Sequence, residues 1–525
     1  MCCAALVACC LCSPGRITGQ SAAYAQAEAL VRNHQWDEGL AEVLRLLKSD
    51  PRNTRELNLA GLALTGKGDI PQANEYFRKV LLIAPGFVPA LKNLAINEFN
   101  QKRYDDAEKH LLTASKDAPN DPIIHLYLGE AAYRQHDFQL SAEALSRSPD
   151  FVHSNASVAA HLATSYLELG QQENAFKILD TLGAAPIDPP SQFALGVALL
   201  RHGLAERSIP YLEAVRLLYP DSYDIGFDLA LGYLGTKQFP KAIQEAKDLI
   251  ARGHDTSELN NLLGEAYEAD NQVQNAVDAL RRAIALDPAD EDNYLDFASL
   301  CMNQRSLQAG LTVIQVGLES HPKSDRLIFM RGVLHATQDE FEMAEKDFRL
   351  AADLSPQNNL GYVGLGVSYL ETGHDAQAIE ILHRRLKENP NDASLLYLLG
   401  EALIRSGAAA GSPAQIEAQT SLEKSIRLNP NLCLPHVSLG TLYLDEDRPS
   451  DAVEQFEKAR AIDPKERSAY SHLAVAYRRI GQIDKSKEVL NNLKQVIEQE
   501  RQSTREKMKT TQGAAGGDES KDRKQ

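Results

Sequence analysis

The sequence predicts an all-α protein built as a tandem array of helical hairpins. Three observations support this fold class. Proline recurs at intervals of 34 residues, apolar residues within each interval follow two successive helical faces, and a small residue recurs at one fixed site of many predicted helices. A fixed period of about 20–50 residues is typical of repeat proteins, in which each unit stacks on its neighbours to bury a continuous core.

Proline marks the end of most repeats, and is replaced near His153 and His254. Steps of 34 residues separate Pro51, Pro85 and Pro119, then Pro186 and Pro220, then Pro288, Pro322, Pro356 and Pro390, and finally Pro430 and Pro464. The step from Pro390 to Pro430 is 40 residues because the chain carries a six-residue insertion there. Proline cannot continue a helix and disfavours helical geometry in the residue before it, so each hairpin is expected to end at the same point.

Each interval contains two predicted helices. Between Ser324 and Pro356, apolar residues define one helical face before a polar turn at 338–340 and a second face after it. The first face contains Leu327, Ile328, Met330, Val333 and Leu334, and the second contains Phe341, Ala344, Phe348, Ala351 and Leu354. Helices of about 12 to 14 residues, each about 20 Å long, are therefore expected.

Small residues indicate where the two helices of a hairpin meet. One site of the first helix is occupied by Gly61, Gly129, Gly196, Gly264, Gly332, Gly366, Gly400 and Gly440. One site of the second helix is occupied by Ala73, Ala107, Ala175, Ala242, Ala276, Ala344, Ala378 and Ala452. A small side chain allows two helices to approach closely, so these sites are predicted to lie at the contact between helices.

This pattern resembles the tetratricopeptide repeat family. The segments "YVGLGVSYLETGHDAQAIEILHRRLKENP" (362–390) and "HVSLGTLYLDEDRPSDAVEQFEKARAIDP" (436–464) carry the resemblance most clearly. It implies a right-handed α-solenoid superhelix of about 14 hairpins over residues 18–498, whose first helices line a concave surface that binds proteins or peptides. Before this array, residues 1–17 form a possible export signal or lipobox-like segment, and after it residues 499–525 are predicted to be a disordered charged tail.

The resemblance also implies a partner groove, because certain sites of each first helix usually point into the concave surface. In the later repeats these sites are Phe329, Val333, Val363, Val367, Tyr397, Glu401, Val437 and Thr441. This largely apolar stripe is the predicted partner site. The alternative is that these side chains are buried between repeats, either because the superhelix closes tightly or because the assigned repeat register is shifted by one residue. In earlier repeats the corresponding sites, Leu126, Glu130, Asn261 and Glu265, are more polar and acidic.

No motif of the sequence predicts catalysis, and no cofactor or metal site is expected. The 14 histidines show no metal-ligand spacing. The segment Gly61–Gly68 is similar to a phosphate-binding loop, but Gly68 stands where Ser or Thr would hold magnesium. We therefore predict a non-catalytic interaction scaffold. A recruiting or regulatory subunit of a cell-envelope enzyme or of a secretion or assembly complex is the alternative, and a catalyst with an unrecognised site is a third hypothesis.

Charge and the N-terminus guide the expected partners and location. The formal net charge of −17 does not favour binding to nucleic acid. Residues 1–12 (MCCAALVACCLC) are apolar, and Leu6–Cys9 is similar to a lipobox, which makes Cys9 a possible lipid anchor. Export as a periplasmic protein or membrane-anchored lipoprotein is predicted, with a cytoplasmic protein and a misassigned start as the alternative. No other segment is long and apolar enough to predict a membrane span, and the oligomeric state is left open.

Overall fold

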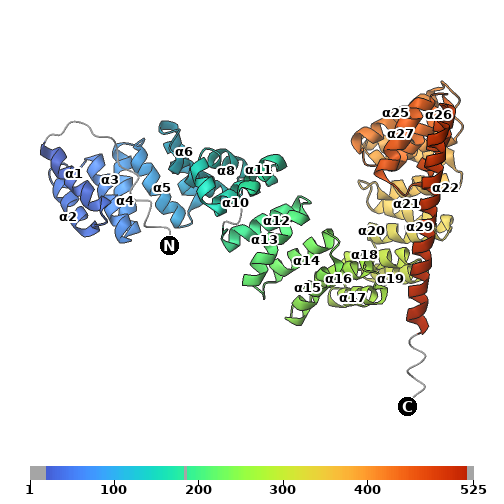
Figure 1. The fold of residues 1–525 in the computed structure, drawn as a ribbon, viewed down its shortest axis with the longest axis horizontal. Coiled ribbons are helices and arrows are strands. Elements are labelled where there is room, and N and C mark those ends of the chain that lie inside the picture. The colour runs from blue at the N-terminus through green and yellow to red at the C-terminus, as the bar shows by residue number, and fades with distance from the viewer. Residues whose placement is uncertain (1–18, 183–185, 517–525) are drawn as a thin grey trace, which may run out of the picture. The chain divides into compact units, whose positions relative to one another are not determined.

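The computed structural model describes residues 19–182 and 186–516, and these residues form helices joined by short turns, with no strand among them (Figure 1). The prediction of an all-α fold is therefore confirmed. The helices belong to two compact units, Met1–Arg252 and Gly253–Gln525. The predicted export or lipobox-like segment, residues 1–17 with Cys9, lies outside the described residues.

The first unit contains α1 to α15. Their bounds are α1 Gly19–Arg32, α2 Trp36–Leu47, α3 Thr54–Lys67, α4 Ile70–Ile83, α5 Val88–Asn100, α6 Tyr104–Asp117, α7 Pro122–Arg134, α8 Phe138–Leu145, α9 Pro149–Ser154, α10 Ala156–Glu168, α11 Gln172–Leu182, α12 Pro189–Arg201, α13 Ala205–Leu218, α14 Tyr223–Gly235 and α15 Phe239–Ala251. The short helix α9 lies between the hairpin of α7 and α8 and the hairpin of α10 and α11.

The second unit contains α16 to α29. Their bounds are α16 Ser257–Ala269, α17 Val273–Leu286, α18 Glu291–Asn303, α19 Leu307–Ser320, α20 Asp325–Thr337, α21 Phe341–Leu354, α22 Leu360–Glu371, α23 Asp375–Glu388, α24 Ala393–Arg405, α25 Pro413–Leu428, α26 Cys433–Asp445, α27 Pro449–Ile462, α28 Arg467–Arg479 and α29 Ile483–Gly516. In this unit the even-numbered helices are the first helices of their hairpins and the odd-numbered helices are the second.

A capping residue starts many of the first helices just after the proline that ends the previous hairpin. Asn53, Asp121, Asp188, Asp290, Ser324 and Asp392 each lie two residues after a repeat proline and accept a backbone N–H of the following first turn. Such a cap satisfies a donor that the helix itself leaves unpaired. Proline and cap together therefore fix both the end of one repeat and the start of the next.

In every hairpin, a residue shortly after the end of the first helix adopts the left-handed conformation. These residues are His34, Gly68, Lys102, His136, Gly170, Gly203, Lys237, Asn271, Arg305, Asp339, Gly373, Gly407, Asp447 and Gly481. At Asp339, whose φ is 61°, the backbone N–H donates to Ala336 O at 3.1 Å, and the N–H of Glu340 donates to His335 O at 3.0 Å. This pair of bonds closes the end of the first helix and turns the chain back for the second.

The glycines of the first helices provide the close contact that the sequence predicts. A methyl group built at Gly332 would lie 2.7 Å from Cε1 of Phe348, and one at Gly440 would lie 2.6 Å from Cε1 of Phe456. At Gly400 the corresponding distance to Cγ of Leu422 is 2.7 Å. These distances are too short for a real side chain, so a large residue of the second helix fills the space that each glycine leaves.

The C-terminal helix differs from the prediction for the tail. Helix α29 continues to Gly516, so residues 499–516, which were predicted to be disordered, are helical, while residues 517–525 lie outside the described residues. Its first half packs Val489, Leu490 and Leu493 into the C-terminal core. The sequence that follows Leu493 is rich in Glu, Gln, Arg and Lys, which are residues of high helix propensity.

Among the described residues, no helix combines the length and apolar character that crossing a bilayer requires.

The contact between Gly332 and Phe348 predicts a stability effect. Gly332→Leu should lower the free energy of unfolding by about 2 kcal/mol or more, because Phe348 cannot move aside without disturbing its own packing. Urea unfolding of the full chain, followed by circular dichroism, measures the change. The matched control is Gly235→Leu, since a methyl at exposed Gly235 meets only Ala205 Cβ, at 3.6 Å. Equal losses in the two variants would show that the contact is not specific.

Candidate partner-binding surface

Three consecutive first helices of the second unit, α24, α26 and α28, form a pocket of about 270 Å³. Helix α24 contributes Tyr397, Glu401 and Ile404, helix α26 contributes Leu434, Val437, Ser438 and Thr441, and helix α28 contributes Ser468 and His472. Four of the eight predicted groove residues, Tyr397, Glu401, Val437 and Thr441, therefore line one concavity. Their binding role stays a prediction.

Hydrogen bonds across neighbouring helices hold the polar side of this pocket. Ser438 donates from Oγ to Oε2 of Glu401 at 2.6 Å, and Nδ1 of His472 lies 3.0 Å from Oγ1 of Thr441. Thus α24 is tied to α26, and α26 to α28. Because each bond joins two hairpins, the pocket depends on the packing of successive repeats.

The electrostatic environment of the pocket is acidic. Burial raises the pKa of the Tyr397 hydroxyl, and the negative charges of Glu401 and Glu466 raise it further. Arg405 opposes this effect, but its guanidinium donates to Leu370 O at 2.6 Å and so is directed to another helix. The pocket is therefore suited to neutral or positively charged groups.

The other four predicted groove residues are placed differently. Phe329, Val333 and Val363 are half-buried and pack against the apolar core of α20 to α24. The ring of Phe329 lies 5.3 Å from that of Phe348, between centroids. Val367 is 42% exposed. Burial between repeats, the alternative left open by the sequence, thus applies in large part to α20 and α22.

Sequence reasoning missed five pocket residues, and their positions explain why. Ile404 follows Glu401 by three residues and Leu434 precedes Val437 by three, so both lie on the same helical face as predicted residues. Ser438, Ser468 and His472 come from helix faces that meet only when successive hairpins stack. Extending the predicted helical face by three residues would therefore have identified Ile404 and Leu434.

The acidic character predicted for the earlier repeats is present on α16 and α18. Burial and the carboxylates of Asp292 and Glu265 raise the pKa of Asp296 to about 6. Burial and Glu268 raise the pKa of Glu265. The side chains of Glu265 and Asp296 are nevertheless exposed to water. Repulsion from the neighbouring carboxylates is therefore an important cause of both raised pKa values.

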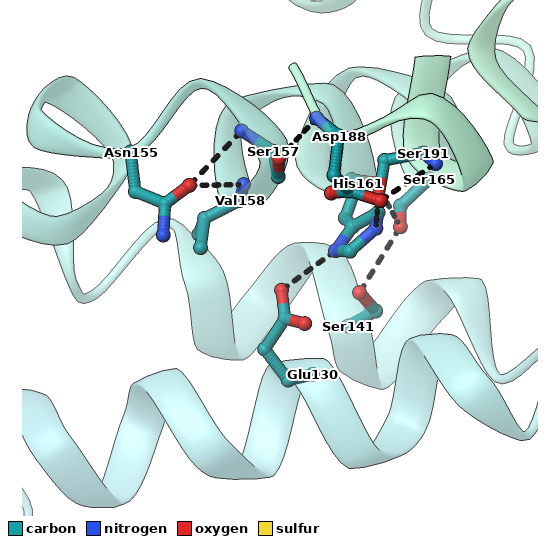
Figure 2. Close-up of polar contacts among 9 residues, drawn as sticks. All are labelled: Glu130, Ser141, Asn155, Ser157, Val158, His161, Ser165, Asp188 and Ser191. Carbon is teal, nitrogen blue, oxygen red and sulfur yellow. Dashed lines mark hydrogen bonds and ion pairs between the residues drawn. The ribbon is translucent and has the colours of Figure 1, made fainter. Parts of the chain in front are cut away.

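In the first unit, Glu130 does not lie on an open groove as its repeat position implies. It belongs to a buried polar network centred on His161 of α10 (Figure 2). Nδ1 of His161 lies 2.8 Å from Oε1 of Glu130 on α7, and Nε2 lies 2.7 Å from Oγ of Ser191 on α12. Tyr133 stacks on the imidazole with ring centroids 4.1 Å apart. The network therefore joins three consecutive first helices.

This arrangement of Ser191, His161 and Glu130 has the connectivity of a catalytic triad, but its serine is not placed for attack. Ser191 is 2% exposed, and its hydroxyl donates to Oδ2 of Asp188 at 2.7 Å (Figure 2). Burial alone would raise the pKa of Asp188, but hydrogen bonds with Ser157 and Ser191 outweigh it and lower the pKa of this carboxyl. Asp188 thus stays an ionised acceptor for the serine, as suits a structural network.

The described part of the chain holds no group of three or more His, Cys, Asp or Glu side chains arranged to bind a metal ion.

Family models identify the repeats. Three tetratricopeptide repeat models match this chain: one at 64–130 and 443–503, a second at 24–86, 227–291 and 363–420, and a third at 325–358. The chain belongs to the tetratricopeptide repeat family. Because the matched segments do not cover every hairpin, the number of 14 repeats stays a prediction.

Similar proteins come from bacteria and eukaryotes. Cellulose synthase operon protein C of Pseudomonas fluorescens is 24% identical over 448 residues, which cover 77% of this chain and 34% of that protein. The CTR9 homolog of Arabidopsis thaliana is 23% identical over 386 residues, which cover 62% of this chain and 35% of that protein. The chain thus spans about a third of the length of these relatives.

Two solved structures are similar to this chain at low identity. The crystal structure of yeast Tom70 is 17% identical, with 82% of this chain and 97% of that chain covered and a TM-score of 0.42. The crystal structure of a tetratricopeptide repeat protein from Parabacteroides merdae is 16% identical, with 48% of this chain and 98% of that chain covered and a TM-score of 0.40.

The raised pKa of Asp296, about 6, predicts a pH dependence of stability. The folded chain holds this proton more tightly than the unfolded chain, so the contribution is full below about pH 4 and is lost as the pH rises through about 6. Asp296→Asn should therefore raise the unfolding temperature at about pH 7.5, with a difference that shrinks toward about pH 3.5. Asp278→Asn, on the second helix α17, is the control, and a parallel pH dependence for it would contradict the assignment.

The burial of Ser191 predicts that it does not react as a nucleophile. A fluorophosphonate probe should leave the purified full chain unlabelled, because its phosphorus atom cannot reach a hydroxyl that is enclosed and bonded to Asp188. In-gel fluorescence, with an active serine hydrolase as positive control, measures the labelling. Labelling of the wild-type chain that disappears in Ser191→Ala would instead identify a catalytic serine.

Proposed function

We propose that this protein is a non-catalytic protein–protein interaction scaffold that binds a peptide or a partner segment on the first helices of its second unit. The observation that carries the proposal is the pocket of α24, α26 and α28, to which three successive hairpins contribute side chains. Tetratricopeptide repeat proteins bind proteins or peptides. Their fold generally serves as a scaffold without catalysis.

Rigidity supports this function. The glycine contacts at Gly400 and Gly440 and the hydrogen bonds between successive hairpins hold the pocket residues in place before a partner arrives. A preformed surface loses less conformational entropy on binding than a flexible one, so more of the contact energy appears as affinity. Val367, at 42% exposed, adds an apolar contact on α22 outside the pocket.

A second proposal is a recruiting or regulatory subunit of a cell-envelope enzyme or of a secretion or assembly complex. It is favoured by the similarity to cellulose synthase operon protein C across 77% of this chain. The apolar, cysteine-rich residues 1–12 favour export, with Cys9 as the anchor if the chain is lipidated. The net charge of −17 favours protein partners over nucleic acid.

Affinity capture tests the scaffold proposal. The full chain is the bait in an extract of the source cells, beside a Val367→Glu/Leu434→Glu variant that changes two exposed apolar residues of first helices. Partners should be retained by the wild type and reduced about tenfold or more by the variant, since buried interfacial charges without a partner are costly.

The matched control is Leu350→Glu, because Leu350 is equally exposed but lies on the second helix α21. Circular dichroism checks that the three proteins are equally folded. Partners that are lost with Leu350→Glu but kept by the first-helix variant would place binding on the other face of the hairpins.

A further inference from the structure

The pocket of α24, α26 and α28 has an apolar side and an acidic side. Ile404, Leu434 and Val437 supply aliphatic surface, and Leu434 is 44% exposed although it is a large hydrophobic residue. Glu401 stands on the polar side beside Ser438. An occupant must therefore cover aliphatic carbon and at the same time face a carboxylate.

The acidic side lacks a cation of its own. Among the residues that the structure describes, Glu401 forms no ion pair, and Ser438 is its hydrogen-bond partner. Oε1 of Glu466 accepts a hydrogen bond from Oγ of Ser468 at 2.5 Å. The nearby Arg405 donates a hydrogen bond to Leu370 O, and its Nε lies 3.7 Å from Oδ1 of Asp375. A half-buried carboxylate without an ion pair can gain from a positively charged partner, because a hydrogen bond between charged groups is stronger than one between neutral groups.

The size of the pocket limits the occupant. Its volume of about 270 Å³ is below the range of about 300–1,000 Å³ that is typical of small-molecule sites. One aliphatic side chain fits this space, and an extended peptide can run past it because three adjacent helices border the opening.

We propose that this pocket binds a peptide segment in which an aliphatic residue, seated against Ile404, Leu434 and Val437, is adjacent to a lysine or arginine that pairs with Glu401. The inference rests on the proposed scaffold function and names the chemistry of the partner at that site. The basic residue supplies the missing cation, and the aliphatic side chain removes the exposed surface of Leu434 from water. Binding should therefore need both groups together.

A phage-displayed library of random 12-residue peptides tests the chemistry. The immobilised full chain selects peptides after depletion on the Leu434→Glu variant, so that pocket-dependent sequences remain. The expected result is enrichment of an aliphatic residue next to Lys or Arg. Fluorescence polarisation of the enriched peptides then measures affinity for each variant.

Glu401→Gln preserves the shape of the side chain and an acceptor for Ser438 while removing the charge. It should weaken binding of the enriched peptide about tenfold, the size expected for loss of a hydrogen bond between charged groups. The matched control, Glu342→Gln, removes the same charge from an exposed site on the second helix α21 and should leave the affinity unchanged.

The outcomes separate this inference from the scaffold proposal. Pocket-dependent peptides without a basic residue, or equal affinity for wild type and Glu401→Gln, would overturn the basic-peptide inference and leave the scaffold proposal standing. If no peptide distinguishes the wild type from Leu434→Glu, both proposals fail at this pocket.

Discussion

The contact between a glycine of one helix and a large side chain of the next is the constraint on which many of the hairpins depend. At Gly332 and Gly440 the space that a side chain would need is already filled by Phe348 and Phe456. This contact brings two helices close together at a fixed point and thereby sets their relative rotation. Proline, cap and left-handed turn then determine where each helix begins and ends. Surface residues such as Glu401 obtain their direction from these contacts, which explains why a binding surface can form without any strand or long loop.

The two units use polar groups between hairpins in different ways. In the first unit, His161 is enclosed between Glu130 and Ser191, so its hydrogen bonds are satisfied inside the protein and join α7, α10 and α12. In the second unit, Glu401 and His472 bond to neighbouring helices yet still line an accessible pocket. The same repeat position thus joins neighbouring hairpins where the side chain is covered and stays accessible from outside where the side chain is open. This difference is the reason why the second unit carries the functional proposals.

The sequence predicted correctly those features that are determined by residues within one hairpin. The proline period and the glycine sites predicted the helices and their contacts, because both act over a few residues or across one turn. The groove was harder to predict, since exposure depends on how adjacent hairpins stack. Phe329 occupies a groove position but rests on Phe348, because Gly332 and Gly364 leave that ring room. The partners of His161 lie 31 and 30 residues away, close to the repeat period itself, so their spacing carried no separate signal.

The six-residue insertion shows how such a chain can change its length. The structure accommodates it at the turn between α24 and α25, with Gly407 and Gly411 in left-handed geometry, and in α25, which has 16 residues. The contact of Gly400 with Leu422 survives across it. By contrast, one residue inserted inside a helix would rotate all later side chains of that helix by about 100°. Large residues such as Leu422 would then no longer face the glycine of the neighbouring helix. Length variation among descendants of this gene should therefore occur in whole periods or at hairpin turns, where the helical register is preserved.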